Sequence, residues 1–216
     1  MRPDNARLYL CTDARTRQGD FADFLDAAFD GGVDIIQLRD KTIEAAEELE
    51  LLETLKSSAE RHARLWAVND RADIAMLSNA PVLHVGQQDL PLASARHLVG
   101  TAVSIGLSSH TPAQVDDALS ADSLDYFCVG PVWATPTKPG RAAVGIELVH
   151  YASERVRSAG SIRPWFAIGG IDLGNINQIA DAGASRVVVV RAITEADDPT
   201  DAARRLLDAL PPVRWE

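Results

Sequence analysis

An amide and two cations follow an apolar run in the first quarter of the chain. In the segment 33–41 the run ends at Gln37, Arg39 and Lys41. A short apolar run of this kind is typical of a buried parallel strand, and α/β proteins place ligand chemistry at the carboxyl end of such strands. Arg supplies a planar bidentate fork and Lys a movable point charge. The segment therefore predicts an anionic substrate, held by a clamp suited to a diphosphate.

The same cations also have a structural interpretation, as solvated side chains at the start of a helix that we expect from Thr42 onward. Positive charge near a helix N-terminus opposes the helix dipole. That local cost favours a functional role for Arg39 and Lys41. Strand alternation places Gln37 on the same side as Arg39. There it would either hydrogen-bond a heterocycle or be a satisfied polar group inside the protein.

Two carboxylates, Asp70 and Asp89, come just after neighbouring predicted strands. Parallel neighbours lie about 4.8 Å apart, so side chains from adjacent strand ends can share one ion. Oxygen ligands without His or Cys suit Mg²⁺. The alternative is that Asp70 caps a helix after Arg71 and that Asp89 is a turn residue before Pro91. Together with the cations, the pair favours a metal site.

Further polar groups follow the later strands. Thr135, Thr137 and Lys138 lie in a loop bounded by proline and glycine, and Gly169-Gly170 allows a backbone to approach a ligand closely. The region after strands seven and eight of a barrel often binds phosphate. The alternatives are an ordinary turn for the two glycines and a Schiff-base role for Lys138, which its distance from a strand end disfavours.

Short apolar runs alternate with amphipathic helical patterns along the whole chain, which predicts a parallel sheet. Eight units in 216 residues leave about 27 residues each, so we expect one compact (β/α)₈ barrel over residues 1–216. A doubly wound open sheet is the alternative, weakened by the absence of a G-x-G-x-x-G turn. The expected strands are Leu8–Cys11, Val33–Leu38, Leu65–Val68, Val82–Val85, Ala102–Leu107, Leu124–Val129, Trp165–Ile168 and Arg186–Val190.

Local signals refine this pattern. Thr111-Pro112-Ala113-Gln114 is a capping box that predicts a helix start. His84 lies inside a strand and is expected to be a satisfied core residue rather than a base. The stretch from Gly130 to Gly145 is the longest without periodicity, and long loops of this kind are often functional.

Composition excludes several classes of partner. The formal net charge is -10 and the sequence pI is about 4.9, which argues against nucleic acid and anionic membranes. Cys11 and Cys128 lack metal-ligand spacing and fall in apolar segments, so we expect reduced, buried thiols. The sequence begins without a signal-peptide pattern and has no membrane-length apolar run. We expect a cytoplasmic protein with small-molecule substrates; its helical surface can support a homodimer, although no exposed stripe requires one.

Several motifs in one order resemble the thiamine-phosphate synthase family over nearly the whole chain. They are Gln37-Leu38-Arg39-Asp40-Lys41, Val68-Asn69-Asp70, His84 through Pro91, Gly106-Leu107-Ser108, Gly130-Pro131 through Lys138, and Ala167-Ile168-Gly169-Gly170-Ile171. The resemblance implies a (β/α)₈ barrel that joins hydroxymethylpyrimidine diphosphate to hydroxyethylthiazole phosphate. It also implies release of diphosphate and a requirement for Mg²⁺.

The resemblance also implies roles for individual residues. Gln37 would contact the pyrimidine, Asp70 and Asp89 would bind Mg²⁺, and Ser108 would lie near the pyrimidine and the leaving group. The pyrimidine diphosphate would be held by Arg39, Lys41, Asn69 and Lys138. The thiazole phosphate would be bound by Thr135, Thr137 and the backbone of Gly169-Gly170. The catalytic set would be Arg39, Lys41, Ser108 and Lys138. One position departs from the family: Val190 is followed by Arg191, where Ser is common, and Arg191 can meet a phosphate through its side chain or backbone.

The implied reaction is dissociative: diphosphate leaves first, and the thiazole nitrogen captures a pyrimidine-methyl cation. No protein nucleophile is needed, so the protein has to neutralise the leaving group and position two substrates. A thiazole tautomerase on the same barrel and a non-catalytic phosphate binder are the alternatives. Neither needs a diphosphate clamp together with a pair of metal-binding carboxylates.

Overall fold

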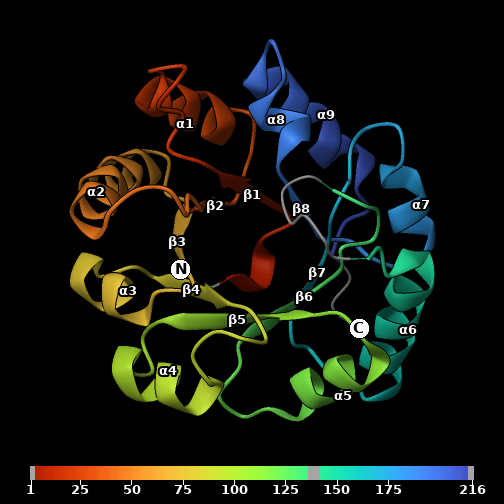
Figure 1. Cartoon of the computed structure of the whole chain (residues 1–216). Helices are drawn as coiled ribbons and strands as arrows, with labels where there is room; N and C mark the ends of the chain where they lie inside the picture. The colour runs from red at the N-terminus through yellow and green to blue at the C-terminus, as the bar shows by residue number, and fades with distance from the viewer. Residues whose placement is uncertain (1–2, 136–141, 214–216) are drawn as a thin grey trace.

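Eight parallel strands form the centre of the molecule, and helices surround them (Figure 1). The structure is a computed structural model that describes residues 3–135 and 142–213. Strands pair in chain order and the last pairs with the first, so the sheet is a closed barrel and the open-sheet alternative is wrong. The strands are β1 (Leu8–Thr12), β2 (Ile35–Leu38), β3 (Leu65–Asn69), β4 (Val82–Val85), β5 (Ser104–Ser109), β6 (Tyr126–Val129), β7 (Trp165–Ile168) and β8 (Val187–Val189).

The helices form the outer layer of the fold. A short 3₁₀ turn, η1 (Pro3–Asn5), precedes the first strand. The α-helices are α1 (Phe21–Asp30), α2 (Ala45–Arg61), α3 (Ala72–Ser78), α4 (Leu92–Val99), α5 (Pro112–Ser120), α6 (Gly145–Ser158), α7 (Ile176–Asp181), α8 (Arg191–Thr194) and α9 (Pro199–Ala209). The last helix, α9, packs against α1 and so completes the ring. Within the described part of the chain, no helix has the length and apolar character of a membrane span.

Alternation along each strand divides the apolar residues into two cores. The larger core lies between the barrel and the helices and includes Ile36, Val68 and Leu83. The smaller core fills the barrel interior with Tyr9, Tyr126, Phe166 and their neighbours. Both cysteines belong to this inner core as buried thiols that form no disulfide, as the sequence predicted.

Element boundaries differ from the sequence-based prediction in informative places. The predicted helix after Thr42 begins at Ala45, because Asp40 holds the preceding loop: its carboxylate accepts hydrogen bonds from the Thr42 amide (2.9 Å) and the Ala14 amide (3.2 Å). Arg39 and Lys41 therefore lie before the first helical turn, and the argument from the helix dipole was wrong. The capping box is confirmed, since Thr111 Oγ1 accepts a hydrogen bond from the Gln114 amide.

Gly106 makes room for the largest ring in the barrel interior. It lies beside Tyr126 in the pairing of β5 with β6, and a methyl group at Gly106 would overlap the phenol ring. Tyr126 is fully buried and its ring meets those of Tyr9 and Phe166 at centroid distances of 6.2 and 5.7 Å. The ring therefore cannot move aside without disturbing its neighbours.

We predict that Gly106→Ala destabilises the protein by about 1–3 kcal/mol, because an added methyl group overpacks this core. Urea denaturation monitored by circular dichroism measures the change. In a Tyr126→Ala background the same substitution should cost much less, because the overlapping ring is gone. An equal cost in both backgrounds would contradict the assignment of the strain to Tyr126.

Candidate functional site

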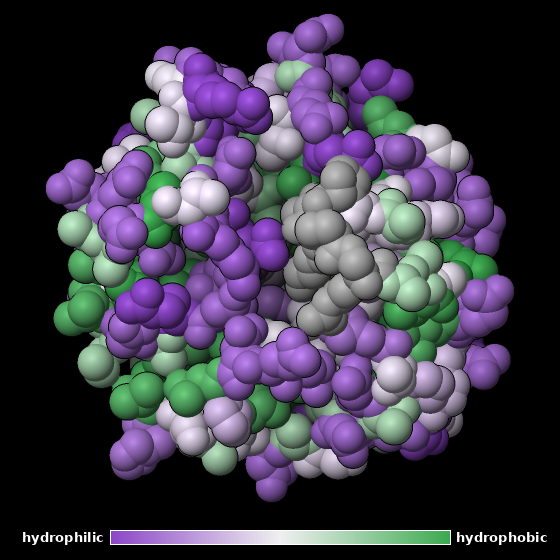
Figure 2. All heavy atoms as spheres, viewed as in Figure 1, coloured by the Kyte–Doolittle hydropathy of each residue, from purple (hydrophilic) through white to green (hydrophobic). Residues whose placement is uncertain are grey.

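Polar side chains gather at the carboxyl ends of the strands. On the face in Figure 2, hydrophilic residues lie inside the ring of helices, at the centre left of the view. Three neighbouring cavities at or below this end share lining residues. Val190 lines all three, while Arg191 lines the two outer ones. The strand ends therefore form one composite site rather than separate clefts.

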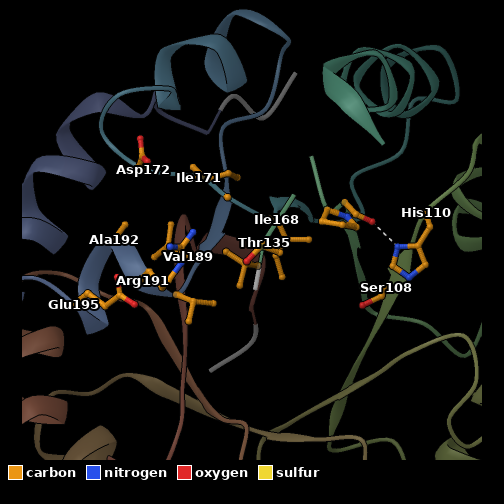
Figure 3. Close-up of a pocket in the computed structure, with 16 residues that line it drawn as sticks. Ser108, His110, Thr135, Ile168, Ile171, Asp172, Val189, Arg191, Ala192 and Glu195 are labelled. Carbon is orange, nitrogen blue, oxygen red and sulfur yellow. Dashed lines mark hydrogen bonds between the residues drawn. The ribbon is translucent and has the colours of Figure 1, made fainter. Parts of the chain in front are cut away.

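The first cavity, of about 230 Å³, lies at the ends of β5 to β8 (Figure 3). It contains Ser108, Thr135, Gly169, Gly170, Val190 and Arg191, all of which were predicted site residues, and also His110, Asp172 and Glu195. The two glycines have positive φ angles of 105° and 68°. A Cβ on Gly169 would approach Pro131 to 2.5 Å, and one on Gly170 would approach Trp133 to 2.8 Å. The glycines are required by the turn itself, and the turn forms a cavity wall.

The second cavity is a cationic groove of about 570 Å³ at the ends of β1, β2 and β8. Arg39 and Lys41 line it, as predicted for an anion clamp, and Arg191 lines it from the opposite edge. Lys41 is 61% exposed, so its ammonium group can move toward a ligand. These groups place positive charge on both sides of the groove, which suits a polyanion.

Sequence reasoning missed part of this groove. Arg15 and Arg17 follow β1 and line the groove too, although the same signal, cations after a strand, could have identified them. Arg15 is fixed by two hydrogen bonds to the Asp20 carboxylate (2.7 and 2.8 Å), and its guanidinium lies 4.0 Å from the centre of the Phe24 ring. It is a structural cation, whereas Arg17 is exposed to solvent.

The third cavity, of about 40 Å³, lies deeper in the barrel. It is lined by Gln37, Asn69, Arg39 and His84 among others. The Gln37 side chain accepts a hydrogen bond from the Tyr9 hydroxyl and donates one to Asn69 Oδ1, both at 2.7 Å. Gln37 is thus a satisfied polar group inside the barrel, as one of the two sequence-based interpretations predicted, and it also lines the third cavity. Its contact with a heterocycle stays a prediction.

The two predicted metal ligands lie together. Asp70 and Asp89 are hydrogen-bonded through their side chains, and Lys41 Nζ lies 2.8 Å from Asp70 Oδ2. Burial opposes ionisation of Asp70, but the hydrogen bond from Lys41 lowers its pKa nevertheless. Burial and the adjacent Asp70 carboxyl raise the pKa of Asp89. Two carboxyl groups in contact repel one another when both are ionised, which a proton or a cation relieves.

The structural alternatives for these carboxylates are partly excluded. Helix α3 has Arg71 at its N-cap position and no side-chain cap, so Asp70 does not cap it. Asp89 does stabilise a turn, because its Oδ2 accepts a hydrogen bond of 2.7 Å from the Gly86 amide. In residues 3–135 and 142–213, no cluster of three or more His, Cys, Asp or Glu side chains is placed to bind a metal. The pair would therefore hold a hard cation only with water or ligand oxygens, a donor set that suits Mg²⁺.

Ser108 connects the first cavity with the barrel interior. Its hydroxyl lies 2.9 Å from His84 Nε2, and its carbonyl accepts a hydrogen bond of 2.8 Å from Gln87 Nε2. His84 is buried and hydrogen-bonded through both ring nitrogens, which confirms the prediction of a satisfied core histidine. Two predicted site residues, Thr137 and Lys138, lie outside the described residues.

Comparison with known proteins agrees with this geometry. The family model described as thiamine monophosphate synthase matches residues 8–193. The chain is 67% identical to thiamine-phosphate synthase of Arthrobacter sp. (strain FB24) and 57% identical to that of Streptomyces avermitilis; each match covers 95% of this chain and 94% of the relative. The solved structure of thiamine phosphate pyrophosphorylase from Pyrococcus furiosus superposes with a TM-score of 0.83 at 26% identity, covering 95% of this chain and 96% of that one. The chain therefore belongs to the thiamine monophosphate synthase family.

Proposed function

We propose that this protein is a thiamine-phosphate synthase. It would join hydroxymethylpyrimidine diphosphate to hydroxyethylthiazole phosphate and release diphosphate. Membership of the family supports the reaction. One observation of the site supports the assignment of this reaction to the residues at the strand ends. Two outer cavities, one walled by a glycine turn and one lined by cations, share Arg191. A reaction between two anionic substrates needs two such places side by side.

The cationic groove would take the diphosphate of the pyrimidine substrate. Arg39 offers a fork of donors, and Lys41 adds a mobile charge. Asn69 and Gln37 border the interior cavity below the groove, where the pyrimidine ring would lie. Lys138 remains a proposed ligand of the diphosphate, supported by its place in the family motif.

The first cavity would bind the thiazole phosphate. Its wall contains the backbone of Gly169 and Gly170, and Thr135 adds a hydroxyl group. Backbone amides and hydroxyls of this kind are suitable donors for phosphate oxygens. Val190 and Arg191 close the cavity on the side of β8, and Thr137 completes the proposed set by motif. The guanidinium of Arg191 would lie between the two anions.

Asp70 and Asp89 would hold Mg²⁺ together with water and diphosphate oxygens. The contact between the two carboxyl groups supports this assignment, since a divalent cation would remove their mutual repulsion. A bound Mg²⁺ would neutralise charge on the departing diphosphate oxygens. Lys41, which bonds Asp70 here, would be released toward the same oxygens.

The chemistry would begin with cleavage of the bond between the pyrimidine methylene carbon and the diphosphate oxygen. The electron pair leaves with diphosphate, whose added charge Arg39 and Lys41 stabilise. The thiazole nitrogen then forms a bond to the methylene carbon and becomes positively charged. Ser108, which lines the first cavity and is hydrogen-bonded to His84 in the barrel interior, would orient the pyrimidine ring. The protein's contribution is charge neutralisation and the alignment of two substrates.

The test of this function is diphosphate release on mixing the protein with both substrates, with Mg²⁺ or with a chelator. We expect release that requires both the thiazole phosphate and the metal, with thiamine phosphate as the product. Saturable binding of thiazole phosphate without diphosphate release would refute the synthase and favour a tautomerase or a binding protein.

We predict that Asp70→Asn and Asp89→Asn each reduce kcat/KM by at least about 100-fold at millimolar Mg²⁺, because each removes an anionic ligand of a hard cation. Magnesium titrations of activity and urea denaturation separate metal affinity from folding. Asp73→Asn is the matched control, since Asp73 is exposed and pairs only locally with Arg71. Wild-type activity in both site variants would contradict the metal assignment.

Lys41→Ala should weaken binding of the pyrimidine diphosphate by about 10- to 100-fold and leave binding of thiazole phosphate nearly unchanged. Isothermal titration calorimetry with each substrate alone measures both affinities. Lys56→Ala is the control, because Lys56 pairs with Glu53 on the outer helix α2. If both affinities fell equally, the two anion sites would be misassigned.

Arg191→Ala should raise KM for both substrates, by about 10-fold each, since its side chain borders both outer cavities. This result would differ from that of Lys41→Ala, which concerns one substrate. Steady-state kinetics with each substrate varied in turn provide the measurement. An effect confined to one substrate would place the guanidinium in one cavity only.

A further inference from the structure

A continuous series of hydrogen bonds crosses the barrel interior, and the proposed reaction makes no use of three of its members, His84, Tyr126 and Tyr9. It joins side chains of six strands, β1 to β6, and ends at two candidate site residues, Ser108 and Asn69. The donor–acceptor distances are 2.9 Å for Ser108 Oγ and His84 Nε2, 3.2 Å for His84 Nδ1 and the Tyr126 hydroxyl, 3.3 Å for the Tyr126 and Tyr9 hydroxyls, 2.7 Å for the Tyr9 hydroxyl and Gln37 Oε1, and 2.7 Å for Gln37 Nε2 and Asn69 Oδ1.

The direction of donation is given by the Gln37 amide. Gln37 Nε2 donates a hydrogen bond to Asn69 Oδ1, and Gln37 Oε1 accepts hydrogen bonds from the Tyr9 hydroxyl and, at 3.6 Å, from Cys11 Sγ. The Tyr9 hydroxyl therefore donates its proton to Gln37.

The two tyrosines transmit this direction toward the histidine. Burial raises the pKa of Tyr9 and of Tyr126 well above the ordinary value, so each hydroxyl keeps its one proton. The Tyr9 hydroxyl donates its one proton to Gln37, so it can only accept a hydrogen bond from the Tyr126 hydroxyl. The Tyr126 hydroxyl in turn donates its proton to Tyr9, so it can only accept a hydrogen bond from His84 Nδ1. His84 Nδ1 must therefore carry a proton.

The packing holds these hydroxyl groups in place. The Tyr9 and Tyr126 rings both meet Phe166 edge to face, at centroid distances of 5.8 and 5.7 Å and interplanar angles of 88° and 77°. The missing side chain of Gly106 leaves the space in which the Tyr126 ring lies. A charged imidazolium at His84 would be a cation buried in the barrel interior, and burial disfavours the charged form. Burial therefore favours the neutral ring.

We propose that this series of hydrogen bonds fixes His84 as the neutral Nδ1–H tautomer. Ser108 then donates its hydroxyl proton to His84 Nε2 and presents only lone pairs to the substrate cavity. His84, Tyr126 and Tyr9 are then positioning residues that act through Ser108. The consequence for catalysis rests on the proposed function. A serine held in this way accepts a hydrogen bond from a donor, such as an amino group on a heterocycle, and repels the oxygens of a diphosphate. Ser108 would therefore select the pyrimidine ring and not the leaving group.

The tautomer can be measured without any substrate. In the full chain labelled with ¹⁵N-histidine, two-bond ¹H–¹⁵N correlation spectra distinguish Nδ1–H, Nε2–H and doubly protonated rings, and His84→Gln assigns the signal. We expect His84 as Nδ1–H in the unmodified protein. Tyr126→Phe and Tyr9→Phe should each reduce that bias, while Tyr151→Phe, which removes a hydroxyl on the outer helix α6, should leave it unchanged. An Nε2–H or doubly protonated His84 in the unmodified protein would overturn the proposal.

The positioning role has its own readout. Tyr126→Phe should lower kcat for thiamine phosphate formation about 10-fold and keep the KM for thiazole phosphate within about twofold, because the loss of one oriented hydrogen bond acts through Ser108 alone. Tyr151→Phe should have wild-type kinetics. An unchanged kcat, or an equal rise of both KM values, would refute the role of the chain in catalysis. If the unmodified protein makes no thiamine phosphate, the proposed function fails. The tautomer measurement still decides the direction of donation along the hydrogen bonds.

Discussion

Closure of the sheet is the constraint on which the rest of this structure depends. Once β8 pairs with β1, every second residue of every strand must fit inside a narrow barrel. The aromatic rings of Tyr9, Tyr126 and Phe166 lie in this interior, and the two tyrosine hydroxyl groups are hydrogen-bonded there, as buried polar groups need to be. The same closure brings all strand ends to one mouth, where loops far apart in sequence become neighbours.

The polar interior links the core to the mouth of the barrel. In many proteins a buried hydrogen-bonded network only contributes conformational specificity. Here its two ends, Ser108 and Asn69, border cavities, so the packing of the core also determines which hydrogen-bonding groups the mouth presents. Fold stability and site chemistry are therefore coupled through the same side chains.

Charge is distributed unevenly over the molecule. The chain carries a formal net charge of -10, yet Arg39, Lys41 and Arg191 gather around one groove. Local cations can bind an anion within an acidic protein because charge interactions at the surface are screened beyond about 10 Å. The adjacent carboxyl groups of Asp70 and Asp89 add a place for a cation between the protein and an anionic ligand.

Sequence reasoning was most successful where a residue's neighbours along the chain decide its environment. Apolar periodicity predicted all eight strands, because a buried strand needs an apolar run whatever lies beside it. It failed for the start of α2, since Asp40 accepts a bond from the Ala14 amide of another loop as well as one from Thr42, and these bonds hold the residues before Ala45 outside the helix. It also missed Arg15 and Arg17, although cations after a strand were a signal it could have used; their place in the groove depends on β1 lying between β2 and β8.

The sequence by itself determined the alternation of strands and helices, the buried thiols and the polar residues at each strand end, because these depend on local pattern and composition. Only the tertiary structure decided which strand ends share a cavity, that Lys41 reaches Asp70, and that Gly106 accommodates Tyr126. The direction of the hydrogen bonds from Ser108 to Asn69 was also beyond the sequence. Each of these properties depends on distances between residues that are remote in the chain, and sequence spacing does not fix such distances until the barrel has closed.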